Sequence, residues 1–275
     1  MKAYASVYES LGLPSELIDC AMGRIPSPVV GLESPAQWYG YPPALIPIWS
    51  DGSRPTYIGC WKHWFVERPS TFVKMYVASG RLTVEIARDA DQLLCIVAMM
   101  AISVADGVEP ELEGFARRVG IANLQEIDEV SLQSGDDPKG FVNLEQFKAS
   151  VPLESVATKA DYDGDFALSD LAANTDWLSR SCSFELSENV QSELKSVDVT
   201  LPAWLGESED KRQVFDSFLA DGDLASAWLT LNSHGWSIEA ARSGIQDLER
   251  VARDRQFTEL ADAWLQVADV GAGSY

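Results

Sequence analysis

Alternating apolar and polar residues predict an antiparallel sheet in the first hundred residues. The run 81–87 alternates three aliphatic side chains with polar ones, which is the pattern of a strand with one buried face. The runs 56–66 and 70–78 are rich in aromatic and β-branched residues, which favour strands. The short Ser79-Gly80 connection suits a tight hairpin. We therefore expect a meander of three or more strands.

Helical patterns flank this predicted sheet. Tyr4 to Leu11 carries apolar residues at helical spacing, and the prolines between positions 26 and 47 predict an irregular stretch after it. Asp89 is a suitable N-cap for a helix over 90–105. That helix is apolar on nearly every side, so we expect it to be buried against the sheet.

From about residue 122 onward, the apolar spacing is helical. The expected helices, besides an earlier one over 111–120, cover 123–134, 143–150, a segment starting at a Ser169 cap, 209–222, 223–235, 237–255 and 257–268. Short turns between the final segments predict antiparallel neighbours. The predicted fold class is α+β, a small antiparallel or mixed sheet with packed helices followed by a mostly α-helical C-terminal part.

Charge divides the chain more sharply than the helical pattern does. The net charge is −21 over 275 residues, and it amounts to −1 in residues 1–100, −13 in 101–200 and −7 in 201–275. Four of the nine tryptophans lie in the nearly neutral first part. We therefore predict a Trp-rich α+β domain over 1–120 and an acidic helical domain over 121–275. So negative a chain is not expected to bind nucleic acid or an anionic membrane.

Cysteine usage and hydropathy predict a cytoplasmic protein. The four cysteines are scattered, which favours reduced and buried thiols over disulfides. The N-terminus has no apolar stretch of the signal-peptide type. The longest apolar run, 93–105, is shorter than the roughly 20 residues that span a bilayer.

Catalytic and metal-binding motifs are absent from the sequence, so we expect no enzymatic activity, no metal and no cofactor. The acidic segment 161–165 departs from a calcium loop in its glycine position and lacks the final glutamate, which favours a solvated turn. His63 is flanked by tryptophans, and a structural ring packed on Trp is favoured over a general base. His234 is interpreted as a residue at a helix C-terminus.

The acidic excess admits two interpretations. A run of carboxylates is usually a solvated face that aids solubility. Carboxylates can also form a surface complementary to a basic partner and accelerate association with it. The candidate partner-binding residues are Glu109, Glu111, Glu113, Asp128, Glu129, Asp136, Asp137, Asp161, Asp163 and Asp165.

The segment from Tyr41 to Gly52 (YPPALIPIWSDG), which leads into Tyr57-Ile58-Gly59, resembles the SMI1/KNR4-like (SUKH) superfamily. That pattern comprises a proline and spaced hydrophobic residues, a polar turn with glycine, and aromatic strands. The resemblance covers about residues 36–105. It implies an α+β fold without catalytic residues. It also implies the role of many bacterial members, which are immunity proteins that bind and neutralise a toxin.

Three functions remain open on this basis. The first is a non-enzymatic immunity protein that occludes a cognate toxin with a basic surface, for instance a nuclease. The second is a hydrolase or transferase with a pocket near His63, which requires that histidine to lie in a cavity beside a carboxylate. The third is a helical adaptor, in which the Ala-Trp-Leu segments around Trp228 and Trp264 would form a groove.

Overall fold

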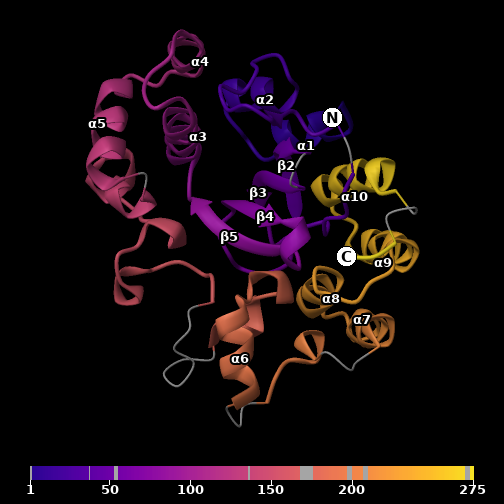
Figure 1. Cartoon of the computed structure of the whole chain (residues 1–275). Helices are drawn as coiled ribbons and strands as arrows, with labels where there is room; N and C mark the ends of the chain where they lie inside the picture. Colours follow the sequence, from indigo (N-terminus) through magenta and orange to yellow (C-terminus); the bar gives the residue numbers. More distant parts are fainter. Residues whose placement is uncertain are drawn as a thin grey trace.

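The protein folds around a five-stranded antiparallel sheet, with helices arranged about it (Figure 1). The computed structural model describes residues 2–36, 38–52, 55–135, 137–167, 176–196, 200–206, 210–269 and 273–275. The strands follow one another in the sheet, and they are β1 (Leu32–Glu33), β2 (Leu45–Asp51), β3 (Thr56–Trp61), β4 (Thr71–Tyr76) and β5 (Leu82–Ala87). The α+β class and the meander expected from the sequence are confirmed.

The strand runs are shorter than the sequence pattern predicts. β3 ends at Trp61, five residues before the predicted end, where the chain turns so that His63 faces the core. The connection between β4 and β5 is also longer than a tight hairpin. It contains the 3-10 turn η2 (Val77–Ser79), after which Gly80 and Arg81 adopt positive φ angles of 66° and 58°. This extended turn brings the Gly80 carbonyl to the helical part of the chain.

The prolines predict an irregular stretch up to position 47. This prediction is wrong at the end of the stretch, because Leu45–Asp51 forms β2. Pro47 is tolerated there, since the pairing of β2 with β3 shifts between Pro47 and Trp49, as it does at a β-bulge. Gly59 of β3 lies opposite Pro47. A Cβ atom on Gly59 would lie 2.4 Å from the carbonyl oxygen of Ile46. The close approach of the two strands therefore requires glycine at position 59.

Gly59→Ala is expected to lower the free energy of unfolding by about 1–3 kcal/mol, because the new methyl group would meet backbone atoms, which cannot rotate away. Gly114→Ala is the matched control. Gly114 lies inside helix α4 (Pro110–Val119) with nothing within 4 Å of the added Cβ, so we expect a gain of about 0.5–1 kcal/mol. Denaturant unfolding measures both changes. Unchanged stability of Gly59→Ala would contradict the close approach.

The helices that precede and follow the sheet are α1 (Ala5–Ser10), α2 (Ser15–Ala21), α3 (Ala90–Ala105), α4 and α5 (Leu124–Ser134). α3 has the bounds expected from the sequence, because the Asp89 side chain accepts a hydrogen bond from the Gln92 N–H and Asp106 ends the helix in a left-handed conformation. It is buried along most of its length, as predicted. α4 and α5 both pack against α3 on one side of the molecule (Figure 1).

The C-terminal part is helical, as predicted. Its helices are α6 (Glu188–Ser196), α7 (Lys211–Ala220), α8 (Leu224–Leu231), α9 (Ile238–Ala252) and α10 (Arg255–Val267). From α7 onward, each helix contacts the next along the chain. None of the described helices has the combined length and hydropathy of a membrane span. The segment predicted to start at Ser169 begins outside the described residues, and Asp176–Arg180 within it forms a 3-10 turn.

The helix predicted over 143–150 is wrong. The chain instead forms two 3-10 turns, Pro138–Asn143 and Glu145–Phe147. Leu144 lies between the two turns with φ −74° and ψ 146°, an extended conformation that interrupts a helix. In this arrangement Phe141, Leu144 and Phe147 are all fully buried.

A continuous core joins residues 1–120 to the helical remainder. Trp264 of α10 donates a hydrogen bond from Nε1 to the Tyr41 carbonyl at 3.1 Å. The Asn232 side chain, just after α8, accepts one from the Ala44 N–H at 2.7 Å. α10 also packs against α1. These contacts cross the predicted domain boundary at residue 120. The division of the chain into two domains stays a prediction from composition.

Candidate functional site

Three of the candidate acidic residues lie together at the start of α4. Glu109 precedes the helix, and Glu111 and Glu113 lie in its first turn. All three side chains are exposed, and the described residues include no ion-pair partner for them. Arg117 and Arg118 occupy the last turn. The helix dipole favours this arrangement, with negative side chains at the N-terminus of α4 and positive ones at its C-terminus.

α5 adds carboxylates on the same side of the molecule, because α5 and α4 both pack against α3 (Figure 1). Glu129 is exposed, and Asp128 is half-buried with its Oδ1 atom out of solvent and without a hydrogen bond. Asp137 is exposed and caps a 3-10 turn by accepting from the Lys139 N–H. Asp136 lies outside the described residues. We call Glu109, Glu111, Glu113 and Glu129 the acidic surface.

The segment 161–165 has a different environment from the acidic surface. Asp163 forms an ion pair with Arg88, and Asp165 forms one with Arg180 at 2.9 Å. The Asp161 carboxylate accepts a hydrogen bond from the Thr158 hydroxyl. The arginines offset the charge of two of these carboxylates, although Asp161 and Asp163 stay exposed, as expected for a solvated turn.

A buried polar network connects β3 to the helical part. The Glu185 carboxylate is fully buried and receives the Arg68 guanidinium at 2.8 and 3.1 Å. Trp61 Nε1 lies 3.2 Å from the same carboxylate, and His63 Nε2 lies 3.3 Å from it. The carboxylate also accepts from the Cys182 N–H at 2.8 Å. The network therefore holds the 3-10 turn η8 (Ser183–Glu185) on the sheet.

The charges in this network follow from its surroundings. Burial alone would raise the pKa of Glu185, but Arg68 and His63 hold it at about 2. Burial lowers the pKa of His63, and the opposing influence of Glu185 is too small to reverse this. At neutral pH the network is therefore an ionised Glu185 paired with Arg68, beside a neutral His63.

The same network contains the one group of metal-ligand side chains found in the described part of the chain. Ligand atoms of His63, Cys182 and Glu185 lie within 4.8 Å of one another. Arg68 does not fit a metal there, because its guanidinium already occupies the Glu185 carboxylate and would repel a cation. Burial also raises the pKa of the Cys182 thiol well above its usual value, which opposes the thiolate that a metal requires.

Burial also bears on His63 and on the two tryptophans that the sequence analysis considers. His63 is 3% exposed and packs edge-on to Trp61, so it has the structural role and does not face a cavity. Trp228 and Trp264 are both fully buried, so they are core residues and do not form a groove. All four cysteines are free and buried, as predicted.

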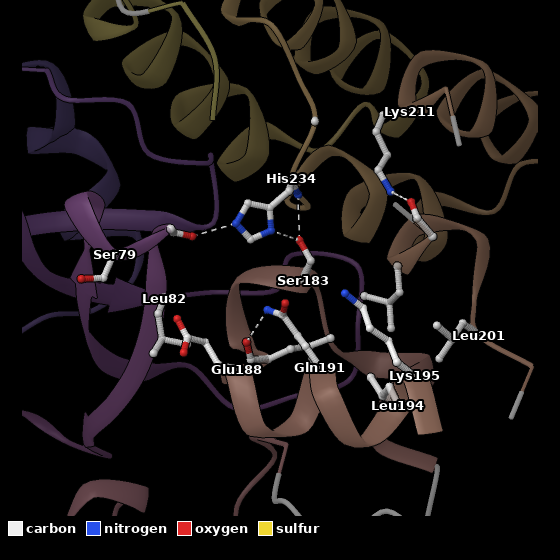
Figure 2. Close-up of a pocket in the computed structure, with 15 residues that line it drawn as sticks. Ser79, Leu82, Ser183, Glu188, Gln191, Leu194, Lys195, Leu201, Lys211 and His234 are labelled. Carbon is white, nitrogen blue, oxygen red and sulfur yellow. Dashed lines mark hydrogen bonds between the residues drawn. The ribbon is translucent and has the colours of Figure 1, made fainter. Parts of the chain in front are cut away.

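A cavity of about 740 Å³ lies between the β4–β5 turn, α6 and the loop that joins α8 to α9 (Figure 2). Its apolar wall consists of Leu82, Leu186, Leu194, Leu201 and Leu205. Its polar groups include Ser183, His234, Glu188, Gln191, Lys195 and Lys211. Lys211 is anchored, since its ammonium donates to the carbonyls of Trp204 and Gly206 at 2.8 and 2.7 Å.

Ser183 and His234 form a hydrogen-bonded pair in this cavity (Figure 2). The Ser183 Oγ lies 2.6 Å from His234 Nδ1, and His234 Nε2 lies 2.8 Å from the Gly80 carbonyl oxygen. The helix-terminal role expected for His234 is wrong, because α8 ends at Leu231 and the imidazole turns away to bridge Ser183 and Gly80. The pair leaves no signal in the sequence, since its members are 51 residues apart and belong to no motif.

A scan against protein-family models found no match to the chain, and searches of the curated proteins and of the solved structures also found no similar protein.

Proposed function

We propose that this chain is a binding protein of the immunity type, which recognises a cognate toxin with a basic surface through the acidic surface of α4 and α5. The observation that carries the proposal is the arrangement of Glu109, Glu111 and Glu113. These carboxylates are exposed at one end of one helix, and no described basic side chain neutralises them. Asp163 and Asp165, by contrast, are paired with arginines.

The chemistry of the partner follows from this charge. A protein of net charge −21 attracts a basic protein over distances of about a Debye length, roughly 10 Å at 0.1 M salt. A nuclease toxin fits this requirement, because the groove that binds nucleic acid must be basic. Occlusion of that groove needs only binding, without a cofactor. A toxin that attacks nucleic acid acts inside the cell, so the proposal places this chain in the cytoplasm.

The proposal predicts that Glu109→Gln, Glu111→Gln and Glu113→Gln together will slow association with the toxin. We expect a decrease of about tenfold in the association rate constant at low salt, because charges at the rim of an interface act mainly on that rate. The toxin candidate is the product of the neighbouring gene, purified in an inactive form. Surface plasmon resonance at about 50 mM and about 500 mM salt measures the effect, which should shrink at the higher salt.

The matched control is the triple variant Asp221→Asn, Glu239→Gln and Asp262→Asn, which removes the same charge from exposed positions of the C-terminal part. It should associate at nearly the wild-type rate. Equal slowing of both triple variants would show that net charge acts without a defined surface. Absence of any complex at either salt would overturn the proposal.

A further inference from the structure

We propose that Ser183 is a nucleophile activated by His234, and that the cavity around them hydrolyses small esters with an apolar acyl group. This inference goes beyond the proposed function, which uses the acidic surface and does not involve the cavity. The cavity belongs to α6, η8 and the α8–α9 loop (Figure 2), whereas the acidic surface belongs to α4 and α5 (Figure 1).

The hydrogen bonds define the protonation state of the pair. The Gly80 carbonyl can only accept, so His234 Nε2 carries the proton and donates it over 2.8 Å. Nδ1 is then an acceptor, and the Ser183 hydroxyl donates to it over 2.6 Å. This arrangement contains a nucleophile, a base bonded to it, and a group that orients the base. A backbone carbonyl takes the orienting role that a carboxylate has in a Ser-His-Asp triad.

Two further features support activation of the hydroxyl. The His234 backbone N–H donates to Ser183 Oγ at 2.7 Å, so negative charge on that oxygen is stabilised as its proton leaves. Burial lowers the pKa of His234 below its usual value, which keeps the imidazole neutral and available as a base near pH 7.

The position of Ser183 is set by groups outside the cavity. Ser183 begins η8, and the last residue of that turn is Glu185. Glu185 points away from the cavity into the core, where Arg68 fixes it. The Ser183 N–H also donates to the Ser233 hydroxyl at 3.2 Å, which ties the turn to the loop that carries His234. Nucleophile and base are therefore held by rigid elements on both sides.

The shape and lining of the cavity indicate the substrate class. A volume of about 740 Å³ lies within the range of small-molecule sites. Its leucine wall would accept an aliphatic or aromatic acyl group. Lys195 extends from α6 toward Ser183 (Figure 2), so the polar side of the cavity carries a positively charged side chain.

The reaction balances with water as the co-reactant. Ser183 Oγ attacks the acyl carbon while its proton passes to His234 Nδ1, and the carbonyl electron pair moves to oxygen. Return of that pair breaks the carbon–oxygen bond to the alcohol, which leaves with the proton from Nδ1. Water then attacks the acyl-serine, Nδ1 takes a proton from the water, and the Oγ–carbon bond breaks. The proton returns to Oγ, and the carboxylic acid is released.

The test is labelling of the full-length wild-type protein with an alkyl fluorophosphonate, combined with hydrolysis of p-nitrophenyl butyrate. We expect one covalent adduct, located on Ser183 by peptide mass mapping, and release of p-nitrophenolate. Ser183→Ala should abolish the adduct and lower kcat/KM by about 100-fold or more, and His234→Gln should lower it by a similar factor. The rate of wild-type protein should fall as the pH drops below the pKa of His234.

Ser181→Ala is the matched control, because Ser181 is buried two residues before Ser183 and its hydroxyl has no hydrogen-bond partner among the described residues. It should keep both the adduct and the rate. A wild-type protein without an adduct on Ser183, or equal hydrolysis by wild type and Ser183→Ala, would overturn the inference. The labelling result needs no variant to fold, and none of these outcomes depends on toxin binding.

Discussion

Glu185→Ala is expected to lower the free energy of unfolding by about 3–5 kcal/mol, because it leaves the Arg68 guanidinium buried without its counter-charge. It also removes the acceptor of the Cys182 N–H and one of two acceptors of the Trp61 indole, which keeps His63 Nε2 at 3.0 Å. Denaturant unfolding followed by tryptophan fluorescence measures the loss. Glu188→Ala, which removes an exposed carboxylate three residues later, should change the stability by less than about 1 kcal/mol.

The pH dependence of stability checks the same network independently. The pKa of Glu185 is about 2 in the folded protein, and that of an unfolded glutamate is about 4.3. The network therefore contributes fully above about pH 5.5, and the contribution, about 3 kcal/mol, is lost as the pH falls through the unfolded pKa toward 2. Glu185→Ala should show a smaller loss over that interval. Equal acid sensitivity of the variant and wild type would contradict an ionised Glu185 in the core.

Trp264→Ala is expected to cost a similar amount, about 3–5 kcal/mol, because a fully buried indole leaves a large cavity. Trp264 packs edge-on to Trp38 and Tyr275, with ring centroids 5.5 and 6.1 Å apart. Its loss also removes the hydrogen bond to the buried Tyr41 carbonyl. Calorimetry should show a lower melting temperature for the whole transition, since α10 packs against the first part of the chain.

Trp177→Ala provides the comparison for Trp264→Ala, because Trp177 is only half-buried. Its effect should be clearly smaller. If Trp264→Ala destabilised only the C-terminal helices and left a separate, unchanged transition for the sheet, the continuous core described above would be wrong.

The sequence is sufficient to predict the bounds of a helix where the N-cap residue and the hydrophobic pattern indicate the same start. The predicted bounds of α3 match the observed ones, because Asp89 caps an apolar run that ends at Ala105. The pattern fails at 143–150, because Leu144 is extended between two 3-10 turns and interrupts the expected helix. Its side chain and that of Phe147 are fully buried, and this tertiary packing leaves no local signal in the sequence.

β2 shows a different limit of sequence reasoning. Pro47 indicates a break in regular structure when only the local sequence is considered. The break is accommodated by a glycine on the neighbouring strand, since Gly59 lies opposite Pro47 and leaves room for the Ile46 carbonyl. The compensation comes from a residue twelve positions away, so local propensity does not predict it.

The candidate sites depend still more on tertiary structure. The sequence predicts that carboxylates after residue 100 meet a partner, but it does not distinguish Asp163, which pairs with Arg88, from Glu111, which has no ion-pair partner among the described residues. It predicts no chemistry for His234. The expectation of a non-enzymatic protein rested on absent motifs, whereas Ser183 and His234 meet only because η8 is anchored on the sheet.

The most direct test of the proposed function is carbodiimide cross-linking of the complex between this chain and the product of the neighbouring gene. The reagent joins carboxylates to lysine amines that are in contact, and mass spectrometry identifies the linked residues. The account predicts cross-links from Glu109, Glu111, Glu113 and Glu129, which are exposed on α4 and α5. Cross-links confined to carboxylates of the C-terminal helices, such as Asp221 and Asp262, would contradict it.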